Sequence, residues 1–422
     1  MNQTIAKRIE EVRHGDIPEG YVLENHQLRP TDWQYEKIGK YLVPYDEFTN
    51  DTEAYPLATS SRQGLMLQSE YYRDQRYEET SGGFHLVPEG YVTYRHMSDD
   101  DIFRFNVNRM GTPVLVSPEY PVFTTREGLN QELLVAYLNN MKEFRAYCSA
   151  QKKGSTRTRM YFSRLGEFAM PIPSFAEQQK IAEILATCDR VIELKQQLLE
   201  EKRRQKQWLM QKLLSGEIKV SQCSGEYKTM KVRDLADSLT GFPFDSDAFS
   251  EDGIRLMRCG NIGSGKTTWE SKVTVFWPTT DSKLASFALQ TGDVVIGMDG
   301  ASVGKSCAMI TDVDLPCYLV QRVTRLRSAY PVLLFQWFRS AKFIDYVKSR
   351  KTVTAIPHIS EQDILEFEIC VPQDAVSIRR IECILSNADK VISAMEKEIA
   401  EWQQKKKALM QLLLTGLIRV NA

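Results

Sequence analysis

The sequence predicts an α+β protein that is an internal duplication: two mixed α/β domains are separated by two long helices, which form an antiparallel coiled coil with pseudo-twofold symmetry. Three observations predict this fold. The segment 181–220 recurs at 381–420 without a gap, both copies have apolar residues at helical spacing, and the segments before them consist of short strand-like runs. The expected boundaries are 1–170 for the first α/β domain, 171–220 for the first helix, 221–370 for the second α/β domain and 371–422 for the second helix.

The duplication keeps one offset of 200 positions, so that Asp189 recurs as Asp389 and Gly216 as Gly416. The same offset continues upstream of the helices, in three matched pairs: Leu133 with Leu333, Leu134 with Leu334, and Lys142 with Lys342. Chance does not preserve one register over so long a stretch. The two halves are therefore expected to share one order of elements.

Each copy is expected to be one helix of about 35 residues, a rod of about 50 Å. Neither copy contains Gly or Pro before Gly216 and Gly416, which are placed as left-handed C-caps. The narrow apolar stripe on so long a helix must be buried against another part of the protein, and the apolar stripe of the other copy can pack against it. The alternative is that each helix packs on its own domain. The residues predicted for the helix–helix interface are Ile181, Ile184, Val191, Leu198 and Leu209 in the first copy and Ile381, Ile384, Val391, Met395, Trp402 and Leu409 in the second.

The segments 20–170 and 228–370 have a different character. Runs such as GYVTYR, PVLVSP, VTVFW, DVVIGM and YLVQRVTRL predict short strands, and Gly, Pro, Asp and Asn separate them. One short helix is expected in each block, at 129–149 and at 330–350. The order is therefore mixed block, long helix, mixed block, long helix.

Composition excludes some classes of protein. Lys and Arg number 54 against 55 Asp and Glu, so a uniformly cationic nucleic-acid coat is excluded, whereas a local cationic surface is not. The eight cysteines form no CxxC pair and no zinc-like cluster, which predicts reduced thiols in a cytoplasmic protein without a metal site. The N-terminal segment lacks a signal-peptide pattern, and the apolar runs are too short to span a membrane.

Several motifs together resemble the specificity (S) subunit of type I restriction-modification systems. PIPSFAEQQKIAEILATCD resembles the start of that family's conserved helical region, and LMQKLLSGEIKV and LMQLLLTGLIRV resemble its ends. GDVVIGMDGASVGKS with RLMRCGNIGSGK resembles its target-recognition domain. The second helical start, VPQDAVSIRRIECIL, departs from the pattern because it lacks Glu-Gln-Gln, and the nearest counterpart of GDVVIGMDG in the first block is EGYVTYRHM.

The resemblance implies a non-catalytic chain that directs other subunits to DNA. Each α/β block would be a target-recognition domain for one half of a bipartite double-stranded DNA sequence, with the helices as spacer. The helices would also dock two methyltransferase subunits, and restriction or translocase subunits would join them. The chain would hold no cofactor, because S-adenosylmethionine, ATP and Mg²⁺ would be bound by the partner subunits. The sequence also contains no NPPY or DPPY tetrapeptide of the kind that holds a target adenine.

Two cationic stretches at matching places, 142–164 and 339–351, indicate phosphate binding. A charge run can also be a solvated face, and a turn residue can be a cap. The predicted phosphate contacts are Lys152, Lys153, Arg157, Arg159, Lys348, Arg350 and Lys351; the predicted base readers are Arg62, Gln63, Arg258 and Asn261; and Lys266 and Lys305 are expected to face DNA from Gly-rich turns.

Two short motifs suggest enzymes instead. GNIGSGKT at 260–267 satisfies the P-loop pattern, but TTWESKVTVFWP after it does not predict the helix that a phosphate site requires. GASVG at 300–304 matches a nucleophile elbow, but SCAMITDVD after it predicts a strand, and His358 is the only later histidine. A P-loop ATPase with a coiled-coil arm and an adaptor whose blocks bind proteins remain the alternatives.

Overall fold

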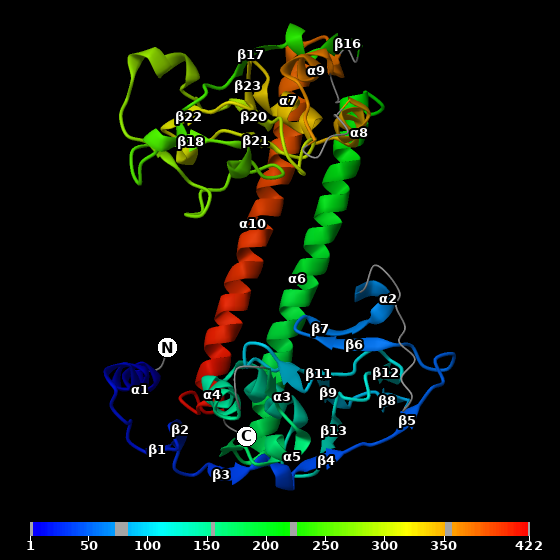
Figure 1. The fold of residues 1–422 in the computed structure, drawn as a ribbon, viewed down its shortest axis with the longest axis vertical. Helices are drawn as coiled ribbons and strands as arrows, with labels where there is room; N and C mark the ends of the chain where they lie inside the picture. The colour runs from blue at the N-terminus through cyan, green and yellow to red at the C-terminus, as the bar shows by residue number, and fades with distance from the viewer. Residues whose placement is uncertain (1–2, 72–82, 153–156, 220–225, 351–356, 421–422) are drawn as a thin grey trace. The chain divides into compact units, whose positions relative to one another are not determined.

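The computed structural model describes residues 3–71, 83–152, 157–219, 226–350 and 357–420. The predicted α+β class is confirmed. The chain forms two compact units: unit 1 is Met1–Leu194 with Ile399–Ala422, and unit 2 is Lys195–Glu398. Each unit contains strands, short helices and part of both long helices (Figure 1). No helix among the described residues is both long and apolar enough to cross a membrane.

Unit 1 contains a four-stranded and a three-stranded antiparallel sheet, in the orders β11-β9-β13-β4 and β12-β8-β5, with four two-stranded pairs around them. The strands of the two sheets are β4 (Leu42–Pro44), β5 (Phe48–Thr49), β8 (Phe84–Val87), β9 (Val92–Tyr94), β11 (Phe105–Val107), β12 (Val114–Val116) and β13 (Val122–Thr125). The pairs are β1 (Tyr21–Glu24) with β2 (Gln27–Pro30), β3 (Gln34–Lys37) with β15 (Ala169–Ile172), β6 (Ala58–Ser61) with β7 (Gly64–Leu67), and β10 (Met97–Ser98) with β14 (Thr158–Arg159). The helices are α1 (Gln3–His14), α2 (Gln68–Tyr71), α3 (Gln131–Asn140), α4 (Lys142–Ala150) and α5 (Phe162–Gly166).

Unit 2 contains a four-stranded sheet in the order β17-β23-β20-β21, a three-stranded sheet in the order β19-β18-β22 and the pair β16-β24. All pairings are antiparallel except the parallel pairing of β18 with β22. The strands are β16 (Tyr227–Lys231), β17 (Ala236–Thr240), β18 (Ile254–Met257), β19 (Phe276–Trp277), β20 (Val294–Gly297), β21 (Cys307–Met309), β22 (Cys317–Leu319), β23 (Val323–Ser328) and β24 (Glu368–Pro372). The helices are α7 (Pro331–Phe338), α8 (Ala341–Arg350) and α9 (Glu361–Glu366).

The single short helix expected in each block is in fact two helices. In unit 1, Met141 is extended, with φ −87° and ψ 132°, and it separates α3 from α4. In unit 2, the hydroxyl of Ser340 accepts a hydrogen bond from the backbone N–H of Phe343 at 3.2 Å and caps α8 separately from α7. Helical periodicity continues across both breaks, so the apolar pattern alone could not reveal them.

The duplication extends into the cores of both units. Phe144 and Phe168 of unit 1 meet edge to face with ring centroids 5.0 Å apart, and Phe343 and Phe367 of unit 2 do the same at 5.0 Å. Tyr147 and Tyr346 each complete a three-ring cluster, at 5.2 and 5.1 Å from Phe168 and Phe367. The repeat found in the sequence is therefore a repeat of packing as well as of helices.

Within each unit, the segments of the long helices α6 (Phe175–Ser215) and α10 (Ala375–Leu414) lie side by side and run in opposite directions (Figure 1). Within unit 2, Lys195 pairs with Glu398 at 2.8 Å, and further along α6 Lys206 pairs with Asp389 at 2.5 Å. Higher numbers on α6 thus meet lower numbers on α10, which confirms the predicted antiparallel pair.

The inner face of each helix follows a strict heptad pattern that differs from the predicted one. Every residue is buried or half-buried at positions 181, 185, 188, 192, 195, 199, 202, 206, 209 and 213 of α6. The same holds on α10 at the positions numbered 200 higher, from 381 to 413. Steps of four and three along this series are the spacing of a left-handed coiled coil. We call these positions the heptad seam.

Part of the predicted helix interface is wrong. Leu198 is 50% exposed and Val391 is 46% exposed, because the neighbouring Leu199 and Ile392 occupy the heptad seam instead. Val191 is half-buried beside the seam. Six of the predicted residues do lie on the seam: Ile181 and Leu209 on α6, and Ile381, Met395, Trp402 and Leu409 on α10. Ile184 and Ile384 instead pack into the cores of units 1 and 2.

Each core is completed by the ends of both long helices. In unit 1, Ile181 and Leu185 from the start of α6 share a core with Leu413 and Leu414 from the end of α10. In unit 2, Ile381 and Leu385 share a core with Leu213 and Leu214. The helices end as predicted at Gly216 and Gly416, whose φ values of +78° and +69° are left-handed.

The departure of the second helical start from Glu-Gln-Gln has a structural explanation. In unit 1, the buried Gln178 accepts a hydrogen bond from the backbone N–H of Asn130 at 2.7 Å, just before α3. In unit 2, position 378 is Ile, and Glu382, one turn further on, accepts from the backbone N–H groups of Val332 and Leu333 at 3.1 Å. In each unit, a side chain of the long helix therefore accepts hydrogen bonds from backbone N–H groups at the start of the short helix, but it comes from a different position in the repeat.

One ion pair of the heptad seam occurs twice. Lys206 binds Asp389 in unit 2, and the equivalent Lys406 binds Asp189 in unit 1. In unit 2, Asp389 also accepts from Gln336 at 2.7 Å and from Arg339 at 3.2 Å. Burial raises the pKa of the Asp389 carboxyl, but these donors outweigh it and the pKa lies below its usual range; burial, followed by the nearby Arg339 charge, lowers the pKa of Lys206.

The two copies of this ion pair should differ in their contribution to stability. Asp389→Ala leaves Lys206, whose side chain is 8% exposed, buried without its carboxylate, and we expect a loss of about 3 kcal/mol in the free energy of unfolding. Asp189→Ala is the matched control: its carboxylate is 61% exposed, and we expect a loss below about 1 kcal/mol. Urea titration of the two variants gives the comparison, and equal losses would contradict it.

Candidate nucleic-acid interface

Two of the predicted cations of unit 1 converge on an acidic turn that the sequence alone did not indicate. Arg62, in the turn between β6 and β7, pairs with Asp100 at 2.5 Å, and Arg157 pairs with Asp99 at 2.7 Å. The hydroxyl of Thr158 donates to Asp101, the third aspartate in succession. The structure therefore brings together two arginines that are far apart in the sequence. The signal that could have revealed this arrangement is the run SDDD at 98–101.

The acidic turn keeps the arginines in place without removing them from solvent. Both guanidinium groups are mostly exposed. Burial raises the pKa of the Asp100 carboxyl, but the hydrogen bonds from Arg62 and Ser98 outweigh it and the pKa lies below its usual value. Asp100 therefore stays ionised and holds Arg62, while the other guanidinium donors can bind a ligand. Gln63 is exposed beside Arg62.

The remaining cations of unit 1 lie near α4 and β14. Lys152 is exposed just after α4, and Lys153 lies outside the described residues. Arg159 is exposed on β14 and donates to the hydroxyl of Tyr161 at 3.4 Å. Arg159 and Tyr161 also line a pocket of about 370 Å³. These positions are compatible with contacts to a polyanion, because their charges are accessible.

In unit 2, the two predicted base readers both support the loop that follows β18, and one of them is fully buried. Asn261 is fully buried: its side-chain oxygen accepts from the N–H of Arg258 at 3.1 Å, and its amide donates to the carbonyl of Thr268 at 3.1 Å. Arg258 is half-buried and donates to the carbonyl of Val273 at 2.6 Å. Asn261 presents no free polar group to a base, so its predicted role as a reader is wrong. Arg258 donates to the loop through one guanidinium nitrogen, and its role as a reader stays a prediction. Both residues brace the segment that follows β18.

The P-loop interpretation of residues 260–267 fails on structure. Ile262 and Thr267 form an isolated antiparallel bridge, and residues 268–275 contain no helix whose N-terminus could hold a phosphate. Gly265 has φ +90°, and a Cβ there would lie 2.9 Å from Nε of Arg339. Glycine at 265 is thus explained by this left-handed backbone, without a bound nucleotide. Lys266 itself is exposed.

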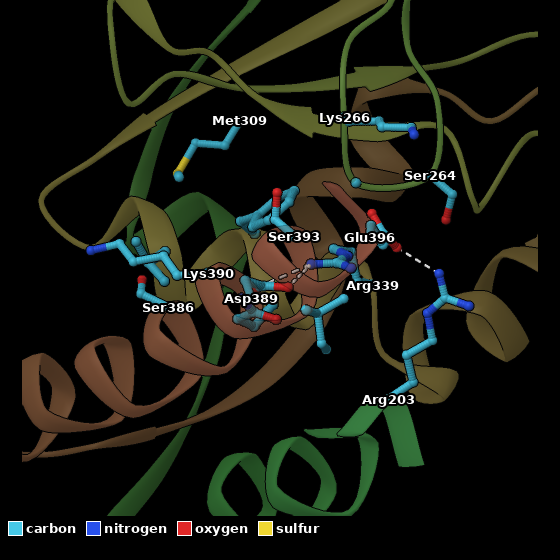
Figure 2. A pocket seen from close by; sticks show the side chains of 15 residues that line it. Arg203, Ser264, Lys266, Met309, Arg339, Ser386, Asp389, Lys390, Ser393 and Glu396 are labelled. Carbon is cyan, nitrogen blue, oxygen red and sulfur yellow. Dashed lines mark hydrogen bonds and ion pairs between the residues drawn. The ribbon is translucent and has the colours of Figure 1, made fainter. Parts of the chain in front are cut away.

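Lys266 lines a pocket of about 500 Å³ within unit 2, formed by this loop, α7 and the long helices. Figure 2 shows Lys266 and Ser264 on one side and, on the other, Asp389 bonded to Arg339 and Glu396 bonded to Arg203. Unit 1 has a pocket of about 700 Å³ at the equivalent place, where residues 132–139 and 186–193 take the positions of 332–339 and 386–393. The repeat therefore provides two corresponding pockets.

The other predicted cations of unit 2 are exposed. Lys305 lies in the turn before β21, and the strand that follows confirms that GASVG at 300–304 is not a nucleophile elbow. Lys348 and Arg350, on α8, pair with Asp345 at 2.8 Å and Asp363 at 3.5 Å. Lys351 lies outside the described residues. Among those residues, no group of three or more His, Cys, Asp or Glu side chains could hold a metal ion.

Comparison with known proteins first gives the class. A family model described as the type I restriction modification DNA specificity domain matches residues 87–202. That segment includes most of the sheets of unit 1, the cationic stretch and the first part of α6. The predicted resemblance to specificity subunits of type I restriction-modification systems is thereby confirmed.

Individual relatives extend the similarity over the chain. The specificity subunit of the type I restriction enzyme MjaVIII from Methanocaldococcus jannaschii is 24% identical over 427 residues, covering 94% of this chain and 96% of that protein. The specificity subunit of the Escherichia coli enzyme EcoAI is 27% identical over 237 residues, covering 54% of this chain and 37% of that protein. The crystal structure of a type I S subunit from M. genitalium has a TM-score of 0.55 at 14% identity, covering 92% of this chain and 97% of that one. A structure described as the basis of complex assembly and conformational transition of the type I R-M system gives 0.54 at 14% identity, covering 92% and 99%. These two structures share the fold.

Asn261 and Lys266 offer a test of structural against ligand-binding roles within one loop. Asn261→Ala removes the buried side-chain oxygen and nitrogen that make these two hydrogen bonds, and we expect a loss of about 1–3 kcal/mol in the free energy of unfolding. Lys266→Ala should leave stability unchanged but weaken DNA binding and lower the slope of log affinity against log salt by about one. Denaturant titration and filter binding at several salt concentrations measure both effects. A salt slope that Lys266→Ala leaves unchanged would exclude a phosphate contact at this position.

Proposed function

We propose that this chain is the DNA sequence-specificity subunit of a type I restriction-modification complex and that each α/β unit reads one half of a bipartite target. The observation that carries the proposal is the duplication of the helices and cores around dissimilar strands and loops. Similarity to the M. jannaschii specificity subunit over 94% of the chain supports it. An antiparallel pair of equivalent helices has a local twofold axis, and duplex DNA has the same symmetry.

The chain is a non-catalytic subunit, and methylation and cleavage belong to its partners. We place two methyltransferase subunits in the complex, joined by restriction or translocase subunits, acting on double-stranded DNA in the cytoplasm. The corresponding pockets of units 1 and 2 support two copies of one partner, because both lie at the same place in the repeat and Asp189 and Arg190 in one correspond to Asp389 and Lys390 in the other. The side chains at the other shared lining positions differ between the two pockets. S-adenosylmethionine, ATP and Mg²⁺ would be bound by those partners.

The gap between the two half-sites would be set by the length of the helix pair. α6 and α10 are continuous over 41 and 40 residues, and neither has a break that could absorb a change in length. At a rise of about 1.5 Å per residue, seven residues correspond to about 10 Å, or about three base pairs. The strict heptad seam means that seven residues can be removed without moving the seam to another face.

The target of the complete complex tests the function. We expect the chain, expressed with its methyltransferase subunits in a host lacking other adenine methylation, to direct methylation to two short specified blocks separated by a fixed unspecified gap. Single-molecule sequencing of the host genome reads the target directly. A contiguous target, or methylation that does not depend on the chain, would refute the proposal.

A paired deletion tests the role of the helices. Removing residues 195–201 and 394–400 together should shorten the unspecified gap by up to about three base pairs while leaving both specified blocks unchanged. Removing four residues from each helix is the control, because it moves the seam to another face and should abolish methylation. An unchanged gap after the heptad deletion would contradict a spacer role.

A further inference from the structure

Arg322 lies in the turn between β22 and β23 of unit 2, and an aspartate holds its guanidinium group. Nη1 of Arg322 donates to one carboxylate oxygen of Asp299, and Nδ1 of His358 contacts the other. The side chain of Asp299 is 12% exposed, whereas that of Arg322 is 66% exposed. The carboxylate is therefore a fixed support, and the remaining donors of the guanidinium are accessible to a ligand.

The backbone of Arg322 is also constrained. Its φ of +67° lies in the left-handed region, which residues with a Cβ rarely adopt. Its carbonyl accepts hydrogen bonds from the N–H of Met298 at 2.9 Å and from Sγ of Cys259 at 3.0 Å, and the next residue, Val323, is fully buried. A strained backbone that several neighbours hold in place is typical of functional positions.

Stability alone does not account for the arrangement. An ion pair whose arginine is this exposed contributes little to folding. Burial raises the pKa of the Asp299 carboxyl, but the hydrogen bonds from Arg322 and His358 outweigh it and the pKa lies below its usual value. The aspartate is thus ionised, and its effect is to restrict a long side chain to one geometry before any ligand arrives.

The surroundings of Arg322 suit a DNA duplex. Asp299 begins the turn that contains the exposed Lys305, and the N–H of Gly300 donates to the carbonyl of Pro357 at 3.1 Å, next to His358. A cation available for phosphate and an arginine of fixed geometry therefore lie in one group of loops. Recognition of a duplex combines these two kinds of contact, because phosphate contacts position the protein and base contacts specify the sequence.

We infer that Arg322 reads a guanine in the half-site of unit 2, through paired hydrogen bonds to O6 and N7 in the major groove, and that Asp299 is its positioning residue. This inference rests on the proposed function. It gives unit 2 a base reader in place of Asn261, whose buried amide supports a loop. It also assigns the major-groove edge of a guanine as the group that this part of unit 2 would bind.

The test uses the full chain with its methyltransferase subunits and reads methylated targets from the host genome. In the wild type, one half-site should require a guanine at one position. Arg322→Ala and Arg322→Lys should both reduce the preference for guanine at that position about tenfold or more, with every other position unchanged. Arg322→Lys keeps the charge, so its loss of preference isolates the paired geometry, and it carries the test if the alanine variant does not fold. Asp299→Asn should relax the same position to a smaller extent.

Arg327→Lys is the matched control, because Arg327 lies on β23 and makes two hydrogen bonds, of 2.7 and 2.8 Å, to the almost fully buried Asp293. We expect it to lower the thermal midpoint and leave the target unchanged. An unchanged target in both Arg322 variants would overturn the inference. Uniform weakening across all sequences, with a salt slope lower by about one, would also overturn it by identifying a phosphate contact. If the wild-type complex has no bipartite target at all, the proposed function fails before this inference is reached.

Discussion

The heptad seam between α6 and α10 is the constraint on which the rest of the molecule depends. Both α/β cores include residues from the start of one long helix and the end of the other, so each core is complete only when the two helices pair in this register. The seam contains Lys195, Lys202 and Lys206 on α6 and Lys406 on α10. Polar groups at seam positions cost stability but specify register, because any other alignment separates Lys206 from Asp389.

Carboxylates organise the candidate interface in both units. Asp99 and Asp100 hold Arg157 and Arg62 in unit 1, and Asp299 holds Arg322 in unit 2. This arrangement agrees with the nearly neutral composition, since the chain contains 54 Lys and Arg residues and 55 Asp and Glu residues. A chain of this kind does not attract DNA through a large positive field. Affinity would depend on a few arginines whose geometry is set in advance, and on partner subunits.

The sequence predicted the fold class, the duplication and the ends of the long helices, because these depend on local periodicity and on glycines. It predicted the helix interface less well. On α6, lysines at positions 195, 202 and 206 interrupt the apolar pattern, and Leu198 then completes an apparent stripe one position away from the true one. On α10, Val391 and Ile392 are adjacent apolar residues, and only Ile392 lies on the seam. Long aliphatic stems allow lysine to occupy such positions, which an apolar count cannot detect.

For the candidate site, the sequence located cations but not their partners. The pairs that hold Arg62, Arg157 and Arg322 join residues from 23 to 58 positions apart, and no local pattern links them. Asn261 looked like a reader because it lies in a Gly-rich turn, yet that turn needs a buried amide to satisfy its backbone. Function in such loops depends on tertiary contacts, which the chain acquires only when it folds.

The exchange of helix ends between the two cores has one more consequence. A chain cut after Gly216 would keep the start of α6 in its own core but would lack Leu413 and Leu414, and it would leave Leu213 and Leu214 without the core that buries them. Since the missing and the surplus residues are equivalent in the repeat, a second copy of the same fragment offers what the first one needs. The single polypeptide is in this respect equivalent to a tethered homodimer, with strands and loops that differ between its two halves.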